Sequence, residues 1–277
     1  MSVKLLRIRD IKSQDIIYGI FHCKYKELKK TKYGDPYISL GLFDSSGSIE
    51  GKLWHNSNHY DGRFDEGDIV AIKGSPNIYR KNIEINISHI AKYDSSIYDT
   101  YGFSGESIVA KTGFDSISLF REICNYFKYA GRYSDIIRAI YKDYKKSIVS
   151  VPYKIDADYQ VEGSYLISLY RSIKIFDLLS SSSFKKDSTD SELVYSLIFL
   201  KKFYIVSGYE KKIIYVLNEE SIDRGPINVF HDCLKNYKNL VSRKDFSRLE
   251  RCLFDSESTS SEEILVSEIF RLVEYAD

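Results

Sequence analysis

The 277-residue chain is long enough for two ordinary domains, and its 43% hydrophobic and 29% charged residues exclude an intrinsically disordered protein. A formal net charge of +1 excludes a strong positive field over the whole molecule, so any binding of nucleic acid has to come from a local patch. The four cysteines lie far apart with no C-x-x-C pair, which argues against a zinc ribbon and against a disulfide framework.

The first ten residues lack the long apolar run of a signal peptide, and no stretch approaches the roughly 20 apolar residues of a membrane span. We therefore expect a cytoplasmic protein without a membrane partner. The histidines of the first third, His22, His55, His59 and His89, have no cysteine or carboxylate cluster at metal-ligand spacing beside them. The sequence accordingly predicts no metal site and no cofactor.

Residues 16–93 show short apolar alternations separated by turn-forming sequences. The turn signals are Gly-Asp-Pro at 34–36, Ser-Ser-Gly at 45–47, Glu-Gly-Asp at 66–68 and Gly-Ser-Pro at 74–76. The predicted strands lie near residues 16–26, 36–43, 48–54, 68–75 and 82–91. Five strands of this length in under a hundred residues predict an OB barrel.

Alternation within the second and third predicted strands separates a core face from an outer face. The core positions are Ile38, Leu40, Leu42, Ile49, Gly51 and Leu53. The outer positions are Tyr37, Ser39, Gly41, Glu50, Lys52 and Trp54. One face of these strands is therefore predicted to carry aromatic and charged groups.

After Tyr93 the pattern changes to apolar residues at helical spacing. A link rich in Ser, Gly and Asp, near residues 94–116, precedes this part, and a second exposed loop is predicted at 180–191. We therefore predict an α+β protein with an OB domain at 1–93, a linker at 94–116 and a helical domain at 117–277.

An OB barrel holds single strands by stacking bases on exposed aromatic rings while basic loops follow the backbone. The predicted nucleic-acid-binding residues are Lys24, Lys26, Lys29, Lys30, Tyr37, Lys52, Trp54, Tyr79, Arg80 and Lys81. Two alternatives stay open at this stage. The lysines of the first hairpin, with Lys32 among them, are also typical of a solvated surface, and Trp54 is also suited to packing against the helical domain.

Four segments resemble the OB domain of bacterial 3′-to-5′ exoribonucleases that join an OB-fold to an HD domain. They are Gly-Asp-Pro-Tyr-Ile-Ser-Leu (34–40), Asp-Ser-Ser-Gly-Ser-Ile-Glu-Gly-Lys-Leu-Trp (44–54), Gly-Asp-Ile-Val (67–70) and Asn-Ile-Tyr-Arg (77–80). The order and spacing of these motifs make the resemblance fairly specific. A weaker resemblance extends over residues 161–179 and 193–206, where the HD helices would lie; an unrelated helical domain behind a similar OB domain is the alternative.

The resemblance implies a metal-dependent hydrolase, which needs histidines and aspartates at fixed positions to activate water. This chain departs from that pattern. Lys201 and Lys202 stand where the family has its His-Asp pair, Ser168 and Pro226 stand at two other histidine positions, and Arg243-Lys244 resembles a lost His-His pair. Lysines at metal positions add repulsion to the loss of ligands, so we expect a degenerate HD domain without the family's metal site.

Three functions follow from these observations. The first is a non-catalytic protein that binds single-stranded RNA or DNA in the OB groove, with a helical domain that supports it or recruits protein partners. The second is a structural subunit of a replication, transcription or RNA-processing assembly, in which the OB face meets protein. The third is an enzyme using Asp156, Asp158, Asp187 and Asp190, but these lie in predicted loops with no histidine nearby, so we expect no enzymatic activity.

Overall fold

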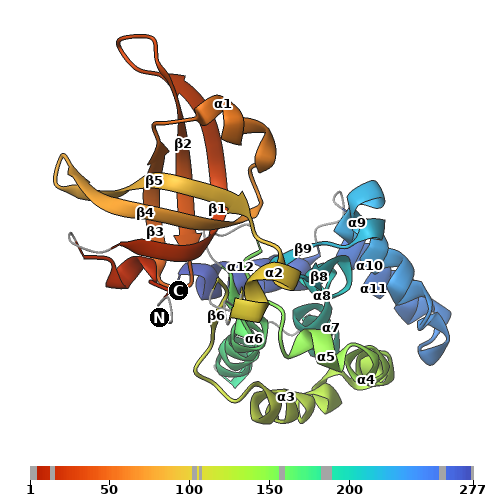
Figure 1. The fold of residues 1–277 in the computed structure, drawn as a ribbon. Helices are drawn as coiled ribbons and strands as arrows, with labels where there is room; N and C mark the ends of the chain where they lie inside the picture. Colours follow the sequence, from red (N-terminus) through yellow and green to blue (C-terminus); the bar gives the residue numbers. More distant parts are fainter. Residues whose placement is uncertain are drawn as a thin grey trace. The chain divides into compact units, whose positions relative to one another are not determined.

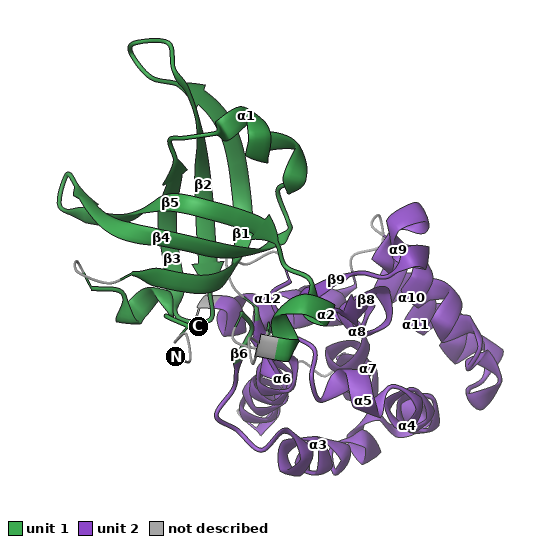
Figure 2. Cartoon of the chain, in the orientation of Figure 1, with its two compact units in different colours: residues 1–110, 156–160 green, residues 111–155, 161–277 purple. Residues whose placement is uncertain are grey.

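The computed structural model describes residues 5–12, 16–101, 105, 108–155, 160–181, 189–255 and 260–275. The chain divides into two compact units, residues 1–110 with 156–160 and residues 111–155 with 161–277 (Figure 2). Of the four aspartates considered above, only Asp190 lies within the described residues. Among the described helices, none combines the length and the apolar character needed to cross a membrane.

The first unit is built around a closed five-stranded barrel with the strand order β1-β2-β3-β5-β4 (Figure 1). Its elements are η1 (Ile8–Asp10), β1 (Ile17–Lys30), β2 (Pro36–Asp44), β3 (Gly47–Leu53), α1 (Ser57–Tyr60), η2 (Asp61–Arg63), β4 (Ile69–Tyr79), β5 (Asn82–Lys92), α2 (Ser95–Tyr98) and η3 (Asp99–Tyr101). This strand order, with a short helix between β3 and β4, confirms the predicted OB barrel.

The barrel interior is filled by the face that alternation assigned to the core. Ile38, Leu40 and Leu42 of β2 are at most 1% exposed and pack with Phe21 and Ile85 from neighbouring strands. Antiparallel pairs join four of the five strand edges, and a parallel pairing between β3 and β5 closes the barrel. Closure leaves no long free edge that could pair with another chain.

The predicted linker contains structure of its own. Asp94 accepts hydrogen bonds from both the backbone nitrogen and the hydroxyl of Ser96 and so caps α2. The ring of Tyr93 stacks on that of Tyr98 at 5.4 Å, and the Tyr93 hydroxyl donates to Asp99. These contacts tie residues 94–99 to the end of β5, and the first compact unit accordingly extends to Ala110.

The second unit is mainly helical. Its elements are β6 (Ala110–Lys111, at the boundary), α3 (Ser116–Cys124), η5 (Phe127–Tyr133), α4 (Ser134–Asp143), α5 (Lys145–Ile148), β7 (Val161–Glu162), α6 (Ser164–Ser181), α7 (Ser191–Leu200), α8 (Tyr204–Gly208), β8 (Tyr209–Lys211), β9 (Tyr215–Leu217), α9 (Glu219–Arg224), α10 (Pro226–Lys235), η6 (Lys238–Leu240), α11 (Arg243–Phe254) and α12 (Ser261–Tyr275). Most of the predicted loop at 180–191 lies outside the described residues.

Helix α7 forms the centre of this unit, because every residue from Leu193 to Leu200 is buried. Asp190 caps the N-terminus of α7 and also forms ion pairs with Arg132 and Arg248. The predicted all-helical part also contains an antiparallel hairpin of β8 and β9. The run Ile-Ile-Tyr-Val at 213–216, which is β-branched and aromatic, favours this extended segment over a helix.

Candidate nucleic-acid interface

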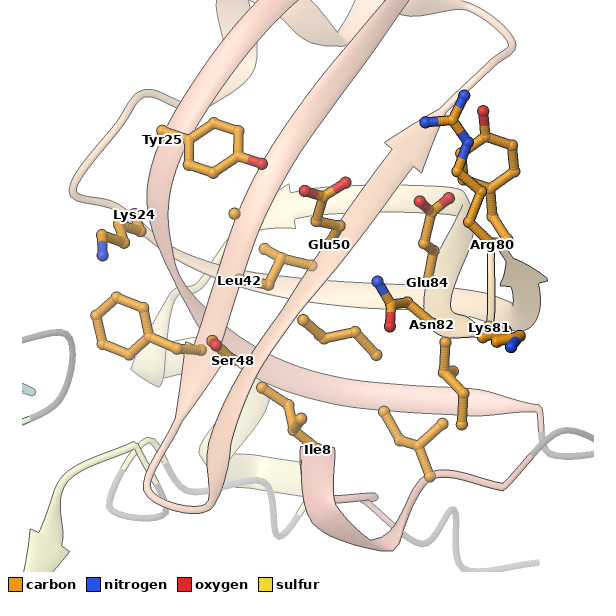
Figure 3. A pocket seen from close by; sticks show the side chains of 16 residues that line it. Ile8, Lys24, Tyr25, Leu42, Ser48, Glu50, Arg80, Lys81, Asn82 and Glu84 are labelled. Atoms are coloured by element: carbon orange, nitrogen blue, oxygen red, sulfur yellow. The ribbon is translucent and has the colours of Figure 1, made fainter.

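Two hairpins project beside the outer face of β2 and β3 (Figure 1). One joins β1 to β2 through residues 31–35, and the other joins β4 to β5 through Arg80 and Lys81. A groove of about 810 Å³ lies against this face (Figure 3). Its lining includes Lys24, Tyr25, Gly41, Glu50, Tyr79, Arg80, Lys81 and Glu84, with Ile8 and Ile11 at one side. In OB barrels, this face and these two loops are where oligonucleotides bind.

The strand register places the outer side chains in rows across β1, β2, β3 and β5. The first row contains Tyr25, Gly41, Glu50 and Glu84, which are direct cross-strand partners. The second row contains Glu27, Ser39, Lys52 and Asn86. The groove is lined by the first row and extends from it toward Ser48 and Ile8, while no residue of the second row lines it, and the hairpin of β4 and β5 forms its rim (Figure 3).

Tyr25 is an aromatic residue of the groove that alternation along β1 did not predict. A β-bulge shifts the register between Cys23 and Tyr25, so that Lys24 is the extra residue and Tyr25 is turned to the outer face. The ring lies across Gly41, where a Cβ atom would come within 2.4 Å of two ring carbons. Partial burial raises the pKa of Tyr25, and the nearby charge of Glu50 raises it further. The glycine thus leaves the space that the ring occupies.

The rim of the groove carries a tyrosine and two cations. Tyr79 is 48% exposed, and the guanidinium of Arg80 lies 5.3 Å from the centre of its ring. Arg80 and Lys81 have positive φ angles of 48° and 73°, as both central residues of a type I′ hairpin turn require. A type I′ turn favours Asn and Gly at these two positions. Arg80 and Lys81 have long side chains, so they adopt the turn at a cost in backbone strain.

Tyr37 and Trp54 lie on the outer face, as predicted, but not among the residues that line the groove. Their rings stack on each other with centroids 4.5 Å apart. The indole nitrogen of Trp54 donates to Asn86 at 3.1 Å, and the tryptophan keeps 40% of its surface exposed. The pair therefore offers a composite aromatic surface at the end of the face near the hairpin of β1 and β2.

Lys52 does not present a free charge on this face. Its ammonium group donates to both carboxylate oxygens of Glu84, at 2.9 and 2.7 Å, and lies 4.8 Å from the ring centre of Tyr79. Glu84 is only 6% exposed, so the pair neutralises a carboxylate that would be costly to bury alone. The structure thus gives Lys52 the role of a counter-ion within the sheet, and its predicted part in nucleic-acid binding stays a prediction.

Lys26 is likewise committed to the barrel. Its cross-strand partner is Leu40, a core residue, because the bulge at Lys24 reverses the faces of the positions that follow it. The ammonium group donates to the Phe64 carbonyl at 2.9 Å and pairs with Asp61 at 3.0 Å, and the side chain is 11% exposed. Lys26 therefore anchors the connection between β3 and β4, an arrangement that does not favour its predicted contact with phosphate.

We expect Lys26→Ala to lower the free energy of unfolding of the first unit by about 2 kcal/mol, because a buried carbonyl and a carboxylate lose a charged donor. Trp54 is the single tryptophan of the chain, so its fluorescence during urea unfolding reports on this unit. Lys30→Ala, an exposed position of the same strand, is the matched control and should change stability by less than about 0.5 kcal/mol. Equal effects of the two substitutions would contradict the anchoring role.

The remaining predicted lysines lie on the first hairpin and at its base. Lys24 is exposed at the groove rim, and Lys29 and Lys30 are exposed near the tip. Lys29 is hydrogen-bonded to Glu27, which raises the pKa of the lysine. The tip also carries Tyr33, which is 80% exposed with the ammonium of Lys32 at 4.9 Å from its ring centre. Both hairpins therefore end in a tyrosine beside a cation.

The histidines and cysteines give no second site. Within the described ranges, no group of three or more His, Cys, Asp or Glu side chains is arranged to hold a metal ion. His231 of α10 instead bonds Glu250 at 2.6 Å. The four cysteines are unpaired thiols, and Cys23, Cys233 and Cys252 are buried.

The comparison with known families matched one segment of the chain, which lies within the first unit. Residues 25–93 match the tRNA anticodon family model, which is described as an OB-fold nucleic acid binding domain. The first unit contains an OB domain, and its matched segment is similar to an OB-fold nucleic acid binding domain. The match begins at Tyr25 and includes all of the groove lining except Lys24, Ile8 and Ile11. Comparison with curated proteins found no match.

Solved structures similar to this chain include single OB domains. The second OB-fold domain of replication protein A from Methanococcus maripaludis aligns with 23% identity and a TM-score of 0.28, covering 33% of this chain and 96% of that one. The small single-stranded DNA-binding protein from Streptomyces coelicolor aligns with 11% identity and a TM-score of 0.26, covering 31% of this chain and 97% of that one. About two thirds of this chain lie outside each alignment.

Proposed function

We propose that this chain is a non-catalytic protein that binds single-stranded RNA or DNA across the outer face of its OB barrel. The observation that carries the proposal is the groove rimmed by the hairpin of β4 and β5, where the exposed ring of Tyr79 lies next to Arg80, in a segment that matches a nucleic-acid-binding family. An interface of this composition suits a flexible strand whose bases are free to stack.

In this proposal the rings and the cations have separate tasks. Bases stack on Tyr25 within the groove and on Tyr79 at its rim, and each stack contributes about 1 to 3 kcal/mol. Arg80 and Lys81 neutralise phosphates, with Lys24 at the opposite rim, and this part of the affinity falls with salt. A duplex keeps its bases paired and offers no ring faces, so it should bind weakly.

The test is a titration of the full chain with single-stranded RNA and DNA, monitored by Trp54 fluorescence and by the anisotropy of a labelled strand. We expect binding that weakens at least tenfold between about 50 and 200 mM salt, and that a duplex of the same sequence does not reproduce. Failure to bind either single strand would overturn the proposal. It would favour the alternative in which the OB face contacts a protein in a larger assembly.

We further propose that the second unit is a degenerate HD-like domain that supports the OB unit or recruits protein partners. Lys201 and Lys202, the residues in place of the family's His-Asp pair, are engaged in pairs with carboxylates of α12. Lys201 lies 3.6 Å from Glu263, and Lys202 lies 3.2 Å from Glu274. These pairs give the two lysines a structural use in place of metal chemistry.

Absence of catalysis is tested by incubating the full chain with end-labelled single strands in the presence of Mg²⁺ or Mn²⁺. We expect no shortening of the strand beyond that in a parallel reaction with chelator, because Lys201, Lys202 and Ser168 supply no metal ligands comparable to His and Asp. Metal-dependent shortening that co-purifies with the protein would overturn this part of the proposal.

A further inference from the structure

Glu50 is a carboxylate in the lining of the groove. It is exposed, lies in the first row between Gly41 and Glu84, and is seen between Tyr25 and Arg80 in Figure 3. Glu84, its neighbour on β5, is neutralised by Lys52. Among the described residues, no cation forms an ion pair with Glu50, so its charge faces the open groove.

This position is unfavourable for the general affinity of the groove. Glu50 is the direct cross-strand partner of Glu84, whose charge is offset by Lys52, whereas Glu50 itself has no ion-pair partner among the described residues. A negative charge in the groove repels the phosphates of a bound strand. A residue that opposes the general affinity of its groove is expected where function requires it.

The chemistry of a carboxylate defines what it can recognise. An ionised glutamate accepts hydrogen bonds and donates none. Guanine presents two adjacent donors on its Watson–Crick edge, the imino N1–H and the 2-amino group, whereas cytosine and adenine each present one exocyclic amino group. Thymine and uracil present one imino donor flanked by two carbonyl oxygens, which a carboxylate repels. A base stacked on Tyr25 would have such an edge within the row that contains Glu50.

We propose that Glu50 gives the groove a preference for bases with amino donors, guanine first and then cytosine and adenine, over thymine and uracil. This inference rests on the proposed function, because it concerns the same groove. In this arrangement Glu50 selects among bases, while Arg80 and Lys81 supply affinity for any single strand. A two-donor contact with a carboxylate gives a discrimination of about tenfold.

The experiment compares unstructured DNA strands of about 12 nucleotides that differ at every third position. The repeats are TTG, TTC, TTI (I, inosine) and an all-thymine strand, so that inosine removes only the 2-amino group of guanine. For the native chain we expect TTG to bind about tenfold tighter than all-thymine, with TTC and TTI between them. The readouts are anisotropy and Trp54 fluorescence at one fixed salt concentration.

Two variants separate base selection from simple charge. Glu50→Gln keeps the shape but can both donate and accept, so it should bind the all-thymine strand more tightly and reduce the preference to about twofold or less. Glu27→Gln removes one charge from the next row of the same face and should retain the tenfold preference. Equal native affinity for all four strands, or a preference that survives in Glu50→Gln, would overturn this inference while leaving single-strand binding intact. No binding to any strand would overturn both proposals.

Discussion

Replacing Tyr25 and Tyr79 together by alanine is expected to weaken single-strand binding by about 2 to 6 kcal/mol, or about 30-fold to about 20,000-fold. Each ring offers a stacking surface worth about 1 to 3 kcal/mol per base. Tyr25 lies on β1 and Tyr79 on the hairpin of β4 and β5, so the two rings serve different bases and their contributions should add. Anisotropy titrations of the native chain, the two single variants and the double variant measure each contribution.

The matched control is the pair Tyr25→Phe and Tyr79→Phe, which keeps both rings and removes only the hydroxyl groups. We expect these variants to bind within about threefold of the native chain, because stacking is carried by the ring. Urea unfolding followed by Trp54 fluorescence then shows whether the alanine variants remain folded. Native affinity in a folded double alanine variant would show that the bases do not stack in this groove.

The core of the barrel could be predicted because an alternating strand buries every second residue. Ile38, Leu40 and Leu42 are buried as the period of two requires, and turn sequences such as Gly-Asp-Pro mark the strand ends. The observed strand bounds differ from the predicted ones mainly at the hairpins. β1 continues to Lys30 and β4 to Tyr79, because cross-strand pairing extends the ladder into residues that have no apolar pattern of their own.

The face of each lysine on β1 could not be predicted, because it depends on one inserted residue. Without the bulge, Lys24 and Lys26 would share the outer face and Tyr25 would face the core. The shift at Lys24 turns Lys26 toward Asp61 and Phe64 and brings Tyr25 over Gly41. No glycine or proline marks this bulge in the sequence. The Tyr25 and Gly41 pairing is a long-range signal that appears only once the register is known.

The charges of the groove also depend on strand pairing between residues far apart in the chain, which local sequence patterns do not reveal. Lys52 and Glu84 are 32 residues apart and meet because β3 and β5 pair in parallel at the closure of the barrel. The same closure places Glu50 beside Glu84 and leaves it without a cation among the described residues. A local count of lysines therefore overestimates the positive charge of the groove and misses the carboxylate of Glu50 in its lining.

Replacing Arg80 and Lys81 by Asn and Gly is expected to stabilise the hairpin while weakening binding. Both positions have positive φ, and a left-handed conformation costs a residue with a long side chain about 1 to 2 kcal/mol. Asn-Gly is the preferred sequence for a type I′ turn, so the free energy of unfolding of the first unit should rise by about 1 kcal/mol. Urea unfolding followed by Trp54 fluorescence measures this gain.

The same variant loses two cations at the groove rim. For single strands the slope of log K against log salt is about 0.7 per phosphate neutralised, so we expect the slope to fall by about 1.4 in magnitude. Arg243→Gln with Lys244→Gln removes two exposed charges from the second unit and should leave the slope unchanged. A tighter fold combined with a shallower slope cannot arise from partial unfolding. Both changes are expected together only if Arg80 and Lys81 destabilise the turn and also contact phosphates. An unchanged slope would show that these two residues do not belong to the interface.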